Sequence, residues 1–229
     1  MKTAILVDGG FYRKRAFKFW GEKNPEERAV ELFEYCLSHL NIQKTKQVEE
    51  HSLYRIFYYD CEPISKKVFH PFTRKTIDLG KTDIFEWTNS FFNELKKKRK
   101  VAIRLGELSE SSAKYILSPD TTKKLFNGEL DIKGVTEEDF IFRADQKGVD
   151  MKIGLDIASL AYKKQVDQIV LISGDSDFVS AAKLARREGI DFILDPMWAD
   201  VKANLTEHVD GIMSPTRKPK DPSKKELKK

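Results

Sequence analysis

The sequence predicts an α/β fold in which a parallel central sheet lies between two layers of helices. Two observations support this fold class: short apolar runs alternate with segments of helical periodicity, and several of these runs stop at an aspartate. Strands that alternate with helices are typical of βαβ units, whose strands run parallel in one sheet. A chain of 229 residues is long enough for one sizeable domain with insertions.

The first part of the chain predicts two strands and a helix. Residues 4–7 form an apolar run that ends at Asp8, and the glycine pair that follows predicts a turn. Asn24 has the chemistry of a helix start, and apolar residues then recur at helical spacing up to residue 40. Residues 53–60 predict a second strand, which also ends at an aspartate.

The later part alternates more regularly. Its pattern predicts helices at 83–98, 149–162 and 178–188, and strands at 101–105, 168–173 and 190–194. We expect one domain at residues 1–212, with an irregular insertion at about 61–136. Residues 213–229 are rich in Lys and Pro and predict a basic, disordered tail.

The net charge of +5 is concentrated in the tail, because residues 214–229 carry seven Lys or Arg against two acids. Such a tail can bind a polyanion through counterion release, and a solvated terminus explains the same composition. Cys36 and Cys61 have no metal-type spacing and predict reduced thiols. No signal peptide is visible, and no apolar run approaches the roughly 20 residues of a membrane span. We therefore expect a cytoplasmic protein that does not enter the membrane.

Aspartates stand at the ends of several expected strands. Asp8 and Asp60 end the first two strands, and Asp175 and Asp177 follow a later one. Because ligands of parallel α/β sheets bind beyond the carboxyl ends of the strands, we expect Asp8 to lie near Asp175 and Asp177. Asp195 also ends a strand, but a proline follows it, which favours a turn.

A single aspartate after a strand is often a helix cap, and that interpretation stays open for Asp175 and Asp177. Several carboxylates at one edge, however, repel one another unless a cation lies between them. Mg²⁺ and Mn²⁺ prefer carboxylate oxygens, and two such ions can activate water for phosphodiester cleavage. The aspartates therefore predict a divalent-metal site and hydrolysis of a phosphodiester.

The helix at 149–162 offers two candidates for a further carboxylate. Asp150 and Asp156 are six residues apart, so their side chains point about 120° away from each other. Asp150 is near the helix start, where a capping or dipole role explains it. Asp156 lies among apolar residues, where an unpaired carboxylate is costly. We therefore select Asp156 as the ligand, with Asp150 as a further candidate.

Three blocks of sequence, ILVDGGF, KGVDMKIGLDI and LISGDSDFVSAAKLARREGIDFIL, carry a resemblance to a known family. In content and order they resemble the NYN domain of the PIN-like nuclease superfamily, and within it the bacterial LabA-like, DUF88 group. The resemblance covers about residues 1–212, and residues 61–136 only loosely. It implies a PIN-like fold, a pocket that binds Mg²⁺ or Mn²⁺, and cleavage of RNA, with single-stranded DNA as a second candidate.

The resemblance also implies roles for individual residues. The metal-binding and catalytic acids would be Asp8, Asp156, Asp175 and Asp177, and Asp150 matches a recurrent acid of the KGVD block. Candidate substrate contacts are the hydroxyls of Ser173 and Ser176 and the basic side chains of Lys152, Arg13 and Lys14. Many relatives carry an asparagine where Phe11 stands, so that contact is absent or comes from elsewhere. The insertion is a candidate for shaping the substrate groove or for homo-oligomerisation.

Two other interpretations stay open. A binding or regulatory module could keep the acidic pocket and cleave little RNA, and the neutral body of the chain permits this. A phosphatase that uses Asp8 as a covalent nucleophile would typically have a second acid two residues on, where Gly10 stands. The first alternative is distinguished from a nuclease by replacing Asp175 and Asp177 with asparagine.

Overall fold

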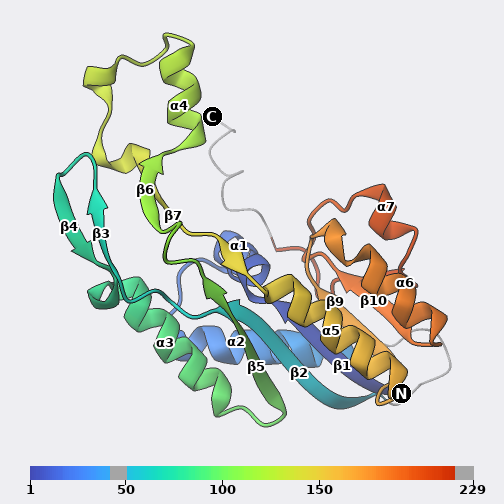
Figure 1. Ribbon diagram of the computed structural model, residues 1–229. Helices are drawn as coiled ribbons and strands as arrows, with labels where there is room; N and C mark the ends of the chain where they lie inside the picture. Colours follow the sequence, from blue (N-terminus) through green and yellow to red (C-terminus); the bar gives the residue numbers. More distant parts are fainter. Residues whose placement is uncertain (42–50, 220–229) are drawn as a thin grey trace. The chain divides into compact units, whose positions relative to one another are not determined.

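The computed structural model describes residues 1–41 and 51–219, and the chain divides into two compact units (Figure 1). The first unit comprises residues 1–60, 90–106 and 148–229, and the second comprises residues 61–89 and 107–147. The second unit therefore interrupts the sequence of the first unit twice.

The first unit is built on a sheet with the strand order β11-β10-β9-β1-β2-β5. The pairings of β1 with β2 and β9, and of β10 with β9 and β11, are parallel. The strands are β1 (Lys2–Asp8), β2 (Ser52–Cys61), β5 (Val101–Leu108), β9 (Gln168–Ile172), β10 (Asp191–Asp195) and β11 (Gly211–Ile212). The last two residues of β5 belong to the second unit and pair antiparallel with β8 (Gln146–Lys147). The seven-stranded sheet is therefore mixed, where the sequence predicted only parallel pairing.

The central strands are apolar along their length. Residues 4–7 of β1 and all five residues of β9 are buried, as expected for parallel strands that are covered on both faces. In the register of the sheet, Asp8 is opposite Tyr59 of β2, and Val7 is opposite Ile172 of β9. The carboxyl ends of β1, β2 and β9 therefore lie next to one another.

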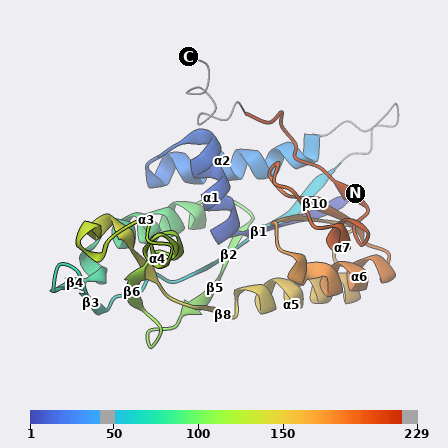
Figure 2. The same ribbon diagram turned by 90° about the horizontal axis from the view of Figure 1, so that it is seen from above.

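Helices cover both faces of this sheet, with α1 and α2 on one side and α5 and α6 on the other (Figure 2). The helices of the first unit are α1 (Gly9–Trp20), α2 (Pro25–Ser38), α5 (Val149–Tyr162), α6 (Val179–Arg187) and the short α7 (Ala203–Thr206). A further helix, α3 (Asp83–Lys96), has its first half in the second unit and its second half in the first. The α/β fold with helices on both faces confirms the expected fold class.

Helix α1 begins immediately after β1, where the sequence predicted only a turn. Its first residues are Gly9 and Gly10, because Asp8 Oδ1 accepts a hydrogen bond from Phe11 N at 3.0 Å and caps the helix. The start of α2 agrees with the sequence, since Asn24 and Glu27 form a reciprocal capping box. The acid that ends the first strand therefore also begins a helix.

The second unit contains two small antiparallel sheets. One is the hairpin of β3 (Lys67–His70) and β4 (Lys75–Asp78), and the other pairs β6 (Lys114–Leu117) with β7 (Phe140–Arg143). The helix α4 (Pro119–Phe126) follows β6. The His70 ring lies 4.5 Å from the ring of Tyr115 and 5.3 Å from that of Phe140, measured between centroids. Aromatic contacts therefore join the two sheets inside this unit.

Both cysteines are buried thiols, and no disulfide joins Cys36 to Cys61, as the sequence predicted. Within residues 1–41 and 51–219, no helix is both long enough and apolar enough to cross a membrane. Most of the predicted basic tail, residues 220–229, lies outside the described residues.

Candidate active site

Asp8 lies at the carboxyl end of β1, and its two carboxylate oxygens have different partners. Oδ1 accepts a hydrogen bond from Phe11 N at 3.0 Å, and Oδ2 accepts one from Ser173 Oγ at 3.2 Å. Ser173 is fully buried and follows β9, and its Oγ also accepts a hydrogen bond from Asp175 N at 3.2 Å. One hydroxyl therefore connects the carboxylate of β1 to the acidic loop after β9.

The loop after β9 carries both acids of the SGDSDF block. Asp175 Oδ1 accepts a hydrogen bond from Asp177 N at 3.0 Å and caps a 3₁₀ turn at Ser176–Phe178, which leads into α6. The side chains of Asp175 and Asp177 are exposed. The capping interpretation is therefore correct for Asp175, and it leaves Oδ2 of that carboxylate accessible to a ligand.

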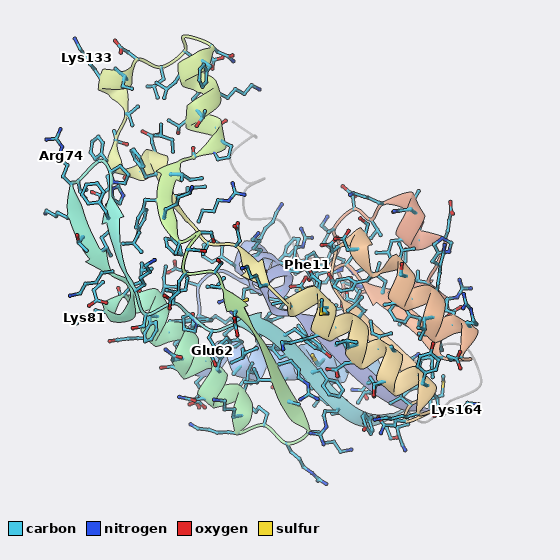
Figure 3. The ribbon with its side chains drawn as sticks, in the orientation of Figure 1. Phe11, Glu62, Arg74, Lys81, Lys133 and Lys164 are labelled. Carbon is cyan, nitrogen blue, oxygen red and sulfur yellow. The ribbon has the colours of Figure 1, made fainter. Side chains whose placement is uncertain are left out.

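Two glycines allow the backbone to approach closely at this edge. A Cβ atom on Gly174 would lie 2.6 Å from Cε2 of the Phe11 ring, and one on Gly9 would lie 2.6 Å from Tyr59 O. Both distances are far shorter than packed atoms tolerate. Phe11, labelled in Figure 3, therefore packs its ring on the loop after β9. An apolar contact therefore joins the start of α1 to this loop.

The acids at this edge act on one another electrostatically. The pKa of Asp8 is raised above its ordinary value, mainly by burial and further by the charges of Asp150 and Asp60. The pKa of Asp150 is also raised, first by partial burial and then by the charges of Asp175 and Asp177. No basic side chain of residues 1–41 or 51–219 forms an ion pair with Asp8, Asp150, Asp175 or Asp177. Negative charge thus gathers here without a neutralising partner.

Asp156 has a different environment. Its Oδ2 accepts hydrogen bonds from Tyr59 Oη at 2.8 Å and from Arg104 Nε at 3.1 Å. Arg104 belongs to β5 and lies over the ring of Phe57, with Cζ 5.5 Å from the centroid. The charge of Asp150 is among those that raise the pKa of Asp8. The six-residue spacing therefore turns Asp156 toward a cation, and the selection of Asp156 over Asp150 as a metal ligand stays a prediction.

Asp60 is an acid that the sequence placed at a strand end without a role. It is 2% exposed, and its carboxylate accepts a hydrogen bond from Tyr58 Oη at 2.8 Å. Its other oxygen pairs with the guanidinium of Arg13 at 3.0 Å. Arg13, expected as a substrate contact, is therefore engaged by this carboxylate. The sequence feature that could have indicated the pair of Asp60 and Arg13 is the position of Asp60 near the carboxyl end of β2, the strand beside β1.

The sequence model of the NYN domain matches residues 85–209, more than half of the chain. The chain belongs to the NYN domain family. Since this domain is part of the PIN-like nuclease superfamily, the resemblance found in the sequence is confirmed at that level. Assignment to the LabA-like group stays a prediction.

Two further comparisons add little to the NYN assignment. No curated protein matches the chain. A crystal structure of a protein of unknown function from Vibrio parahaemolyticus RIMD 2210633 is similar to this chain with a TM-score of 0.43 and 15% sequence identity. That similarity covers 93% of this chain and 91% of the other.

The matched NYN region contains Asp150, Asp156, Asp175 and Asp177 but begins after Asp8. Asp8 is connected to the matched region by geometry, through its hydrogen bond with Ser173 and the parallel pairing of β1 with β9. The first strand and the NYN region therefore contribute to the same edge of the sheet.

PIN-like nucleases generally use divalent metals, so the fit of the NYN acids to such an ion matters. In the part of the chain that the structure describes, no three His, Cys, Asp or Glu side chains are grouped so that they could hold a metal ion. The chemistry of the donors fits nevertheless, because Mg²⁺ and Mn²⁺ prefer carboxylate oxygens. The raised pKa values of Asp8 and Asp150 indicate carboxylates that a nearby cation would stabilise.

The remaining substrate contacts expected from the sequence lie in different settings. Lys152 on α5 and Lys14 on α1 have exposed side chains. Ser176 Oγ accepts a hydrogen bond from Lys202 Nζ at 3.4 Å, a basic residue that sequence reasoning missed. Ser173 is fully buried, so it orients carboxylates and does not face solvent. Lys152 and Lys14 are therefore exposed cations, and Lys202 is next to the acidic loop.

Proposed function

We propose that this NYN domain is a divalent-metal-dependent ribonuclease that hydrolyses phosphodiester bonds in RNA. One observation supports the proposal most: Asp8, Asp150, Asp175 and Asp177 come from three segments and influence one another without a basic partner. Acids that only stabilise a fold are normally paired with cations or surrounded by donors, since an unpaired buried charge is costly. Such a group is expected where a cation binds as part of function.

In this proposal the chain holds its acids ready before an ion binds. Phe11 N and Ser173 Oγ fix the two oxygens of Asp8, so this carboxylate has little freedom to rotate. The exposed Asp175 and Asp177, together with Asp150, would complete the ligand set. A bound divalent ion would supply an activated water and stabilise the charge on the leaving oxygen. Lys152 and Lys202 would contact phosphates of the RNA.

Asp156 takes a positioning role in this proposal. Through Tyr59 and Arg104 it connects α5 to β2 and β5, and so fixes the helix that carries Asp150. The ion pair is partly exposed, with 46% of the Arg104 side chain accessible, so its contribution to stability is modest, about 1 kcal/mol.

A binding module that retains the acids but cleaves little RNA is the second candidate. It is favoured by the observation that, across residues 1–41 and 51–219, no group of three or more potential ligands is already arranged for a metal. Both candidates bind RNA, so cleavage decides between them.

Cleavage of a labelled single-stranded RNA in Mn²⁺ tests the nuclease. We expect Asp150→Asn and the double variant Asp175→Asn/Asp177→Asn to lower the cleavage rate at least 100-fold, with circular dichroism unchanged. Asp200→Asn is the matched control, because Asp200 is exposed and lies outside the proposed set. Excess EDTA should abolish wild-type cleavage. If the wild-type protein binds RNA but leaves single-stranded and duplex RNA intact in Mg²⁺ and in Mn²⁺, the binding module is correct instead.

A further inference from the structure

The second unit has an uneven distribution of charge. Residues 63–77, which we call the basic hairpin, contain Lys66, Lys67, Arg74 and Lys75 and no Asp or Glu. The other residues of this unit carry seven Lys or Arg against thirteen Asp or Glu. A polyanion would therefore be attracted to the basic hairpin and repelled by the rest of the unit.

The cations of the hairpin are accessible. Lys67, Arg74 and Lys75 are exposed, and none of them forms an ion pair with a described residue. Arg74 has a φ of 54° and extends from the end of the hairpin, as Figure 3 shows. Lys66 differs, because its Nζ donates to Glu110 O at 2.8 Å. Three positive side chains are thus available to a ligand.

Two phenyl rings are exposed on the same hairpin. Phe69 is 56% exposed and Phe72 is 47% exposed, whereas Val68 and His70, which alternate with Phe69, are 6% and 2% exposed. The alternation follows from the strand, because successive side chains point to opposite faces. Phe69 therefore shares one face with Lys67 and with Thr76, its partner across the hairpin. Lys67 is paired across the hairpin with Asp78, so this face places the Phe69 ring beside one cation and one acid, and Arg74 and Lys75 add positive charge at the turn.

Flat exposed rings between unpaired cations are suited to a single-stranded nucleic acid. Aromatic rings stack on bases with about 1–3 kcal/mol each, and cations follow the phosphate backbone. A base-paired duplex would hide its base faces from the rings. An acidic peptide would match the charges but has no flat surface for Phe69 and Phe72.

We propose that the basic hairpin binds single-stranded RNA, with Phe69 and Phe72 stacking on bases and Lys67, Arg74 and Lys75 contacting phosphates. The choice of RNA rests on the proposed function, whereas the surface belongs to the second unit alone. The hairpin would hold the substrate strand independently of the acids that cleave it.

Binding is measured by fluorescence anisotropy with a labelled 20-nucleotide oligouridylate in EDTA, so that no cleavage occurs. We expect Phe69→Ala/Phe72→Ala to weaken binding at least tenfold. The triple variant Lys67→Gln/Arg74→Gln/Lys75→Gln should also weaken it, and should flatten the dependence of log K on log salt by about 2. Matched controls in the same unit are Phe126→Ala, which removes an 88% exposed ring, and Lys114→Gln/Lys123→Gln/Lys133→Gln. The controls should bind like wild type.

Each outcome separates this proposal from the nuclease proposal. Equal binding by the hairpin variants and wild type, or equal weakening by the controls, overturns the hairpin proposal even if the protein cleaves RNA. Tighter binding of polyglutamate than of oligouridylate would identify an acidic protein as the partner and overturn it as well. Hairpin-dependent binding without cleavage in any metal would support the hairpin and contradict the nuclease.

Discussion

Asp8 and Asp195 end two parallel strands on either side of β9, yet their surroundings are opposite. Asp195 is fully buried, and four potential donors surround its carboxylate. They are Tyr35 Oη at 2.6 Å, Ser214 Oγ at 2.6 Å, Met197 N at 2.7 Å and His39 Nε2 at 2.9 Å. Asp8 accepts two longer hydrogen bonds, and the charges of two further acids, Asp150 and Asp60, raise its pKa.

This difference separates a carboxylate that stabilises the fold from one that is prepared for a ligand. Both oxygens of Asp195 have donors, and the charge of Asp195 adds to the burial that raises the pKa values of Tyr35 and Cys36. At Asp8, burial and other acids disfavour the charged form and raise its own pKa. A carboxylate among donors needs no ion, whereas a carboxylate among acids is stabilised by one.

The largest expected effect on stability is that of Asp195→Asn. The amide has one acceptor oxygen in place of two. Either the donors at Oδ2 (Tyr35 Oη and His39 Nε2) or those at Oδ1 (Ser214 Oγ and Met197 N) would therefore lose their acceptor. We expect the free energy of unfolding to fall by about 3–5 kcal/mol. Urea unfolding measures it, with Asp200→Asn as the exposed control. A loss below about 1 kcal/mol would contradict the distinction between the two aspartates.

The corresponding change at the other strand, Asp8→Asn, should act mainly on activity. We expect RNA cleavage in Mn²⁺ to fall at least 100-fold, since a proposed ligand is lost. The free energy of unfolding at neutral pH should stay within about 1 kcal/mol of wild type or rise, because repulsion from Asp150 and Asp60 is relieved. Loss of stability comparable to that of Asp195→Asn, measured in the same urea titration, would assign Asp8 to the fold instead.

The dependence of the free energy of unfolding on pH should show the effect of Asp8 and Asp150. Asp8 and Asp150 have folded-state pKa values above the ordinary 3.8, so the folded state binds more protons than the unfolded state just above pH 3.8. Their contribution to stability is therefore present at low pH and is lost as pH rises through the raised values.

This contribution is measured by thermal unfolding of the wild type and of the double variant Asp8→Asn/Asp150→Asn at several pH values from 3.5 to 7. The difference in melting temperature, wild type minus variant, should decrease as pH rises. Mn²⁺ should stabilise wild type more at pH 7 than at pH 4, because protons compete for the same oxygens. A difference that increases with pH would show that these carboxylates are stabilised, as that of Asp195 is, by the fold.

The smallest expected effect distinguishes the two acids of α5. Saturating Mn²⁺, at 100 times its dissociation constant, should raise the free energy of unfolding by about 2.7 kcal/mol. Asp150→Asn should remove most of this gain, and Asp156→Asn should keep it while lowering the stability without metal by about 1 kcal/mol. If Asp156→Asn removes the gain and Asp150→Asn does not, Asp156 is the ligand after all.

Periodicity was sufficient for the regular part of the fold. The expected helix at 149–162 agrees with α5, and the strand at 168–173 agrees with β9 to within one residue. Helix α1 was missed because Gly9 and Gly10 are poor helix formers, and the cap from Asp8 compensates for them. The hairpin β3–β4 was missed because its alternation covers only four residues per strand.

The part of the site that lies at the ends of the strands was predictable from the sequence. Asp8 and the loop of Asp175 are connected as parallel pairing required, through one serine. The choice between Asp150 and Asp156 could not be made from sequence. Asp156 lies in an apolar stretch, but its cation, Arg104, comes from a strand 52 residues earlier in the chain. The residues around Asp156 in the sequence indicate that its charge is buried. They do not indicate which distant residue pairs with it.

The two buried cysteines give the chain two natural probes, one in α2 and one at the end of β2. Cys36 is in α2 of the first unit, and Cys61 begins the second. Burial raises the pKa of the Cys36 thiol, so alkylating reagents, which require the thiolate, can modify it only when the helix opens. The rates at which iodoacetamide labels Cys36 and Cys61 would therefore give the opening frequencies of α2 and of the end of β2, in the wild-type chain and without an introduced label.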